Sequence, residues 1–318
     1  MDAPQEYYNN LNNTYTSFPN DSIKRNNISE DISSHNASGY LNLKEYIFIS
    51  VFVICIVGAV GNGMVIWLLG FRIKRNPFIT YILNLAVADF GLLVSTIFMI
   101  VSVWIRFQYP SHIILHVFSL LFLSMYSAGQ FLLTAISIDR CVAVFFPLWH
   151  QCRRPPRLST IVCALIWVIS LLLIVTVFII EKSYLHKSGI LIFCQFIVNA
   201  ALCLPLMTSA TLALFIKVCF KARQQRRGKL LTIILITLFF FILLVFPLNV
   251  IYVLNIYHDL PPYFLECACS LSCINSSVNP VIYFLIGRQW KSRHKETMKM
   301  VLQRVFKEEE RCTEEIQL

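Results

Sequence analysis

Seven long apolar segments, each long enough to cross a lipid bilayer, constrain the fold of this chain more than any other feature. They lie near residues 46–70, 78–105, 113–145, 158–180, 189–216, 230–257 and 263–286. A transmembrane helix needs about 20 mainly apolar residues, because the hydrocarbon layer is about 30 Å thick and a helix rises about 1.5 Å per residue. The pattern predicts an all-α fold, with a seven-transmembrane helix bundle over residues 44–287.

The composition excludes an ordinary soluble domain and indicates an orientation. Hydrophobic residues make up 57% of the chain and charged residues 14%, against about 45–50% and about 25% in soluble domains. Most of the 27 Lys and Arg residues lie in alternate connecting segments and after Gly287. Basic residues close to the spans favour the cytoplasmic side, so we expect a multi-pass plasma-membrane protein with an extracellular N-terminus and a cytoplasmic C-terminus. The net charge of +10 suits anionic lipids and acidic protein surfaces, and we expect no nucleic-acid partner.

The two terminal regions differ from the bundle in composition. Residues 1–43 are rich in Asn, Ser and Asp and are expected to form a disordered extracellular tail. The tail contains four acceptor sequences for N-linked glycans, at Asn12, Asn20, Asn27 and Asn36. In residues 288–318, basic and apolar residues alternate before an acidic finish. This pattern predicts a short amphipathic cytoplasmic helix along the inner leaflet, followed by an acidic tail.

Polar residues inside three spans predict a functional core. Asn62 lies in the first span, Asp89 in the second, and Asn275 and Asn279 in the seventh. An acid at membrane depth is costly unless it has a proton, a cation or several hydrogen-bond donors nearby. We therefore predict that these side chains converge on a polar core that forms a candidate site for a hydrated ion. Pro280 removes a backbone hydrogen bond beside this core and predicts a hinge.

Several motifs together resemble one receptor class. Asn62, the stretch Asn84 to Asp89, Asp139-Arg140-Cys141, Trp167, Pro205, Pro247 and the stretch Asn279 to Tyr283 follow the order and spacing of a rhodopsin-like G-protein-coupled receptor. Within that class, Phe71 to Phe78, Pro147 to Pro155 and Ile274 to Ser277 are similar to the Mas and Mas-related receptors. The resemblance implies a cell-surface receptor that transduces an extracellular ligand to heterotrimeric G proteins, with arrestin as a further candidate partner.

The same resemblance also indicates which residues couple the receptor to the G protein and switch it between its resting and active states. It implies that the coupling and switch residues are Asp139, Arg140, Asn279, Pro280 and Tyr283. In this class the arginine pairs with its neighbouring acid and often with a second acid at the inner end of span six. Here residues 217–257 contain no Asp or Glu, and the entrance to span six is Arg226-Arg227-Gly228-Lys229. Because like charges repel, we expect a weak resting restraint on Arg140 and ligand-independent activity.

Residues on three helices and one loop are candidates for ligand contact. Phe122 and Tyr126 lie one helical turn apart in span three, and further candidates follow Pro247 in span six and flank the extracellular mouth. The full candidate set is Phe122, Tyr126, Glu181, Leu248, Asn249, Tyr252 and Glu266. The acids at the mouth favour a peptide or a basic amphiphile. The alternative for the aromatic side chains is simple packing within the bundle.

The cysteines and the remaining function classes leave some alternatives open. The disulfide usual in the class is absent, and Cys194 has either Cys267 or Cys269 as a possible partner near the outer face.

A retinal protein would need a Lys in span seven, which this chain lacks. The alternative function is a seven-helix transporter or channel without G-protein coupling. Such a protein would need charges spread through the bilayer midplane, yet Asp89 is the one acid well inside a span away from the inner end. No His, Glu or Cys constellation lies at one depth, so we expect no enzymatic activity, cofactor or metal.

Overall fold

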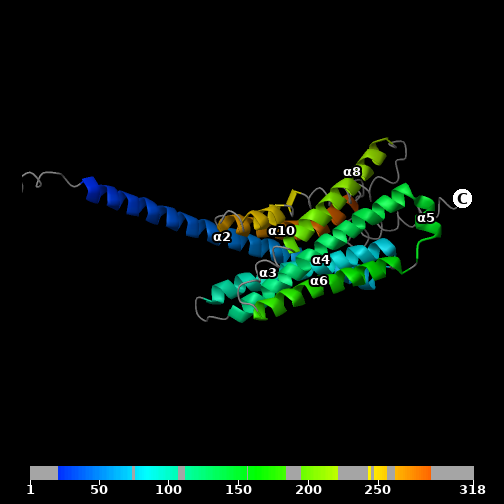
Figure 1. Cartoon of the computed structure of the whole chain (residues 1–318), viewed down its shortest axis with the longest axis horizontal. Coiled ribbons are helices and arrows are strands. Elements are labelled where there is room, and N and C mark those ends of the chain that lie inside the picture. Colours follow the sequence, from blue (N-terminus) through cyan, green and yellow to red (C-terminus); the bar gives the residue numbers. More distant parts are fainter. Residues whose placement is uncertain are drawn as a thin grey trace, which may run out of the picture. The chain divides into compact units, whose positions relative to one another are not determined.

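The computed structural model describes residues 21–73, 76–106, 112–155, 157–183, 195–220, 243–244, 247–255 and 262–287. It divides into two compact units, residues 1–49 and 50–318, and the helix bundle belongs to the second. All regular structure in the described ranges is helical. The main helices are α2 (Asp21–Phe71), α3 (Pro77–Arg106), α4 (His112–Phe145), α5 (Pro147–Cys152), α6 (Leu158–Ser183), η1 (Asn199–Cys203), α8 (Leu204–Phe220) and α10 (Pro262–Gly287) (Figure 1).

These helices confirm the all-α fold and most of the predicted spans. Within the described residues, five segments are long and apolar enough to cross a membrane: 45–71, 77–104, 113–145, 158–179 and 195–214. The helix α10 matches the predicted seventh span, and its several Asn and Ser residues make it less apolar. The predicted sixth span is covered at residues 243–244 and 247–255. Residues 288–318, which include the predicted amphipathic helix, lie outside the described residues.

The N-terminal region differs from the sequence prediction. We expected residues 1–43 to be disordered, but α2 begins at Asp21. The stretch from Asp21 to Ser38 contains no Pro or Gly, so it lacks the residues that most strongly oppose a helix. Asn27 and Asn36 therefore lie on α2, whereas Asn12 and Asn20 lie outside the described residues.

The helix α4 lies at the centre of the described bundle. It packs along α3 and also contacts α6, η1 and α8, while α3 contacts α6 and α10 (Figure 1). Leu85 and Leu93 of α3, Leu132 of α4, and Met207 and Leu214 of α8 are fully buried between these helices. This packing holds the polar side chains of α4 at fixed depths along the bundle.

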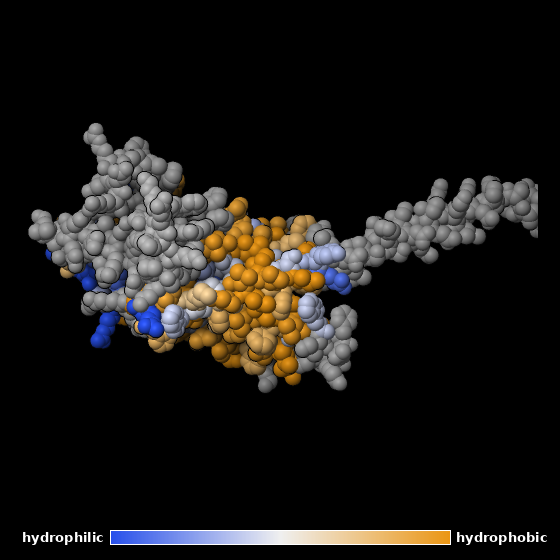
Figure 2. Space-filling view, turned by 180° about the vertical axis from the view of Figure 1, so that it is seen from behind, coloured by the Kyte–Doolittle hydropathy of each residue, from blue (hydrophilic) through white to orange (hydrophobic). Residues whose placement is uncertain are grey.

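The outside of the bundle is strongly apolar. Apolar side chains form a broad zone across the face shown in Figure 2. On α6, Leu165, Leu171 and Leu172 are each more than half exposed. An apolar surface of this extent is unfavourable in water and suits lipid contact.

Two glycines let α2 and α10 approach closely. A Cβ atom at Gly58 would overlap the Ser277 side chain, and one at Gly61 would lie 3.2 Å from Pro280 Cβ. The Ser277 hydroxyl donates a hydrogen bond of 3.2 Å to the carbonyl of Ile54. Small residues are a general means of close helix packing within membranes. Here they bring the first span against the proline of the seventh.

Candidate functional site

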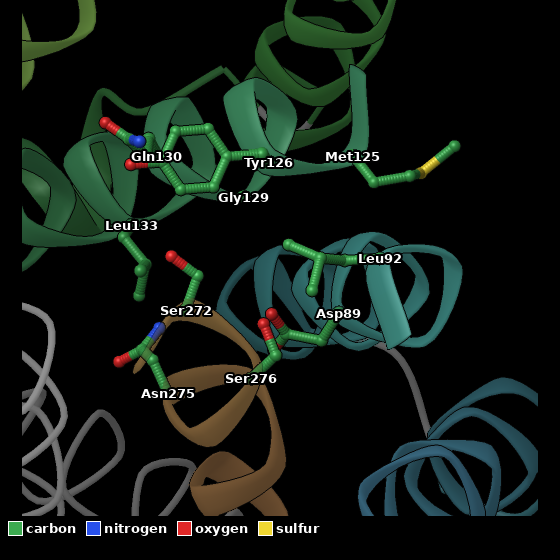
Figure 3. Close-up of a pocket in the computed structure, with 10 residues that line it drawn as sticks. All are labelled: Asp89, Leu92, Met125, Tyr126, Gly129, Gln130, Leu133, Ser272, Asn275 and Ser276. Carbon is green, nitrogen blue, oxygen red and sulfur yellow. The ribbon is translucent and has the colours of Figure 1, made fainter. Parts of the chain in front are cut away.

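Asp89 lies at the centre of a polar cluster shared by α3 and α10. Its side chain is buried, and Asn279 Nδ2 donates a hydrogen bond of 2.8 Å to Asp89 Oδ2. The Ser276 hydroxyl is a further hydrogen-bond partner of the carboxylate and lies beside it in Figure 3. Hydrogen bonds to a charged oxygen offset part of the cost of burying it.

The first span joins this cluster through the backbone of α10. Asn62 Nδ2 donates hydrogen bonds of 3.0 Å to the carbonyls of Gly58 and Ser276. The structure therefore brings Asn62, Asp89 and Asn279 of the predicted polar core to one place. Asn62 acts through the Ser276 carbonyl, a connection that side-chain patterns in the sequence do not reveal.

A small cavity lies next to Asp89. Its volume is about 20 Å³, which is room for about one water molecule. Its polar lining includes Asp89, Asn275, Ser276 and Gln130 (Figure 3). The sequence reasoning missed Gln130, a buried residue of α4 that lies one helical turn from Tyr126. An ion in this cavity would be coordinated mainly by the protein, because there is little room for its own water.

Four aromatic rings, which we call the aromatic stack, contact one another in series beside the cavity, with the central pair, Tyr126 and Phe196, tilted by 43°. The ring centroids are 6.1 Å apart for Phe122 and Tyr126, 5.7 Å for Tyr126 and Phe196, and 4.1 Å for Phe196 and Tyr252. Tyr126 also lines the cavity. Phe196 was missed by the sequence reasoning, since its position in span five gives no sign that it lies between Tyr126 and Tyr252. The stack connects spans three, five and six.

The other candidate ligand residues lie in different surroundings. Leu248 and Asn249 are buried in the helical segment 247–255. Glu266 is half-buried near the start of α10. Glu181 lies in the last turn of α6, and its side chain lies outside the described residues. The buried rings and Leu248 contribute to packing in this structure.

A polar contact between α4 and span five was also missed. Ser127 Oγ accepts hydrogen bonds from Gln195 Nε2 at 2.6 Å and Asn199 Nδ2 at 3.1 Å. Asn199 begins the π-helical turn η1, just before Pro205. The spacing of Gln195 and Asn199, four residues apart in an apolar span, was the available signal.

The opposite end of α4 carries a compact charged cluster. Arg140 Nη2 donates to Asp139 Oδ2 at 2.7 Å, and Arg154 Nη2 lies 2.7 Å from Asp139 Oδ1. The side chains of all three residues are less than 10% exposed. The guanidinium of Arg140 also lies 4.3 Å from the ring centroid of Phe78, a cation–π contact. Asp139 thus has a different arginine at each carboxylate oxygen.

Arg154 is anchored by the segment that follows α4. Its Nη2 atom donates a hydrogen bond of 2.6 Å to Ser159 Oγ of α6, and its Nη1 atom contacts His150 Nε2 of α5. The helix α5 begins at Pro147, since proline is favourable in the first turn of a helix. The sequence reasoning counted Arg154 only among the basic loop residues and missed its pairing with Asp139.

The remaining switch residues belong to α10. Pro280 is buried inside the helix, and Tyr283 lies one turn before its end with its side chain outside the described residues.

Cys267 and Cys269 are both free. Cys194, the possible partner considered from the sequence, lies outside the described residues.

Comparisons with known proteins define the class. The chain matches the family described as 7 transmembrane receptor (rhodopsin family) over residues 61–283. It is 34% identical to the Mas proto-oncogene protein of Mus musculus over 265 residues, which is 80% of this chain and 81% of the relative. It is 35% identical to Mas-related G-protein coupled receptor member A of Rattus norvegicus over 268 residues, covering 80% and 86%.

A third relative agrees with these two. Mas-related G-protein coupled receptor member F of Homo sapiens is 38% identical over 284 residues, which is 83% of this chain and 78% of that protein. The chain therefore belongs to the rhodopsin family of seven-transmembrane receptors and, within it, to the Mas-related G-protein-coupled receptors. These proteins are multi-pass membrane receptors that act through heterotrimeric G proteins, and they are not enzymes.

Proposed function

We propose that this receptor binds an extracellular peptide or basic amphiphile and signals through Arg140 to a heterotrimeric G protein. The observation that carries the proposal is the arrangement along α4. Arg140 is buried against Asp139 at one end, and Tyr126 joins the aromatic stack about 21 Å away at 1.5 Å per residue. The Asp89 cluster lies beside Tyr126 and provides a route between the two ends.

The proposed orientation places the N-terminus outside the cell and the Arg140 end in the cytoplasm. It is supported by the distribution of Lys and Arg, which gather in the segments on the Arg140 side. The same basic residues would contact anionic lipid headgroups, and the Arg140 end would also receive arrestin. The same orientation would make the four tail asparagines accessible to N-linked glycosylation.

The ligand class is supported by charge and by the aromatic stack. Glu266 lies half-buried near the start of α10, and Glu181 lies in the last turn of α6. Acidic groups at the mouth attract cationic ligands from solution. Tyr252 is half-buried and offers aromatic surface for an apolar part of the same ligand.

Two arginines share the Asp139 carboxylate, and this arrangement supports ligand-independent activity. Arg140 holds only one oxygen of the carboxylate, because Arg154 holds the other. The sequence supplies no second acid in residues 217–257. In the described structure, Asp139 and Phe78 are two of the groups that restrain Arg140.

A G-protein activation assay tests the proposal. Membranes from cells with a measured surface density of receptor are exposed to a panel of basic amphiphilic peptides, and nucleotide exchange is recorded for the four Gα classes. Glu266→Gln should reduce the potency of cationic peptides about three- to tenfold and leave neutral peptides unaffected. Solute flux that persists in cells without G proteins, combined with no exchange in any Gα class, would support a transporter instead.

A further inference from the structure

We propose that Arg154 is a reserve counter-ion for Asp139, which keeps this carboxylate paired when Arg140 leaves it to contact a G protein. Arg154 would therefore favour the active state, although it is fourteen residues beyond Arg140 and outside the recognised switch motif. The inference rests on the proposed role of Arg140 in G-protein coupling. It adds a positioning residue to that role.

The geometry assigns one oxygen of Asp139 to each arginine. Arg140 Nη2 lies 2.7 Å from Oδ2, and Arg154 Nη2 lies 2.7 Å from Oδ1. Arg140 can leave without breaking the second contact, because the two pairs share no oxygen atom. His150 lies farther away, with Nε2 at 3.8 Å from Oδ2, on the oxygen that Arg140 occupies.

The anchoring of Arg154 does not depend on Arg140. Ser159 of α6 accepts its hydrogen bond at 2.6 Å, and His150 of α5 contacts its other terminal nitrogen. Its side chain is only 6% exposed. Arg154 is thus held in place by two neighbouring helices.

Asp139 stays buried when Arg140 leaves it, so its charge still needs a partner. The Asp139 side chain is only 9% exposed, and a buried charge without a partner is strongly destabilising. With Arg154 in place, the departure of Arg140 removes one ion pair of Asp139 and leaves the pair with Arg154 intact. Without Arg154, Arg140 could occupy both oxygens at rest, and its departure would leave the buried carboxylate with only the more distant His150 nearby. Both effects oppose activation.

The test measures binding of nucleotide-free G protein to purified receptor in nanodiscs, with the Gα class chosen from a panel of four. Arg154→Ala and Arg154→Gln should weaken binding at least tenfold, while Arg154→Lys, which keeps the charge, should stay within about threefold of the parent. Arg153→Ala is the matched control, because Arg153 is an exposed neighbour, and it should bind like the parent. Thermal unfolding without G protein checks that each variant is folded.

The decisive comparison repeats Arg154→Gln in an Asp139→Asn background. Since the neutral amide in that background needs no counter-ion, the Arg154→Gln substitution should now change binding less than about twofold. If the tenfold loss persists there, Arg154 acts through Ser159 or the fold of α5, and the inference is overturned. Parent-like binding by Arg154→Gln alone would overturn it as well. Failure of the parent to bind any Gα class would instead refute the proposed function, and with it the basis of this inference.

Discussion

Asn279 donates a hydrogen bond of 2.8 Å to the carboxylate of Asp89, and this contact joins α10 to α3. The donor lies directly before Pro280, which interrupts the backbone hydrogen bonding of α10. Asn62 holds the same stretch of α10 through the Ser276 carbonyl. A change in the bend of α10 would therefore alter the surroundings of a buried acid, which makes Asp89 a natural link between ligand binding and signalling.

The first prediction concerns the charge of Asp89. Asp89→Asn keeps the shape of the side chain and an acceptor for Asn279, so the receptor should reach the surface and unfold near the parent temperature. Removing the charge should change the balance of resting and active states by about 1.4 kcal/mol, which is about tenfold in population. We expect reduced G-protein activation, measured by nucleotide exchange at equal surface abundance. Added sodium tests the candidate ion site beside Asp89, and we expect the variant to respond to it less than the parent does.

Asn84 provides a control on the same helix. Its side-chain oxygen accepts a hydrogen bond of 2.9 Å from Trp167 Nε1 of α6, away from the cavity. Asn84→Ala should cost about 1 kcal/mol of stability and leave the sodium dependence unchanged. Equal signalling and equal sodium response in Asp89→Asn and the parent would contradict the proposed link.

The second prediction concerns the tail. If residues 1–43 are extracellular, glycans should be attached to some of Asn12, Asn20, Asn27 and Asn36. Replacing all four with Gln should remove the change in gel mobility that a glycosidase produces in the parent. A parent whose mobility does not respond to the enzyme would refute glycosylation. Protease protection of an N-terminal tag on intact cells would refute the topology separately.

The third prediction concerns ligand-independent signalling. The parent should activate G proteins above the level of empty cells, because span six supplies no acid to hold Arg140. Arg227→Glu places an acid at the start of span six and should lower this basal activity about tenfold, which corresponds to about 1.4 kcal/mol. Arg140→Ala should abolish signalling. The measurement is nucleotide exchange without added ligand, at matched surface abundance.

A lower basal activity that only reflects lower expression of the variant would not support this prediction. Lys229→Glu offers a comparison two residues further along the same basic segment, and it should have a smaller effect if the position relative to Arg140 decides the outcome. Basal exchange no higher than in empty cells, together with unchanged ligand-driven signalling in Arg227→Glu, would refute the weak restraint.

The spans and the receptor class could be predicted because hydrophobic length and motif spacing are local properties of the sequence. The bounds of α3, α4 and α10 follow directly from the apolar runs. Asp89 and Asn279 could be paired in advance, since a buried acid and a buried amide each need a partner. The start of α2 at Asp21 was missed because a polar composition favours disorder without excluding a helix.

Contacts set by tertiary packing could not be read from the sequence. Arg154 looks like one more basic residue in a loop, and only the position of α5 brings it to Asp139. Phe196 and Gln130 have no neighbours in the sequence that indicate which span they face. Their roles depend on the rotation of span five and α4 about their own axes, and helices that are apolar on most of their faces leave that rotation undetermined.

The fourth prediction uses two glycines of α2 that differ in their surroundings. A Cβ atom at Gly58 would overlap Ser277 of α10 and lie 2.9 Å from Leu93 of α3, whereas one at Gly70 would have nothing within 4 Å. Gly58→Ala should therefore force α2 away from α10 and cost about 1–3 kcal/mol, as overpacking usually does. Gly70→Ala should be neutral or stabilise the helix by up to about 1 kcal/mol. Thermal unfolding of both variants in detergent measures the difference, and a Gly58→Ala protein as stable as Gly70→Ala would show that the two helices are not in close contact at this point.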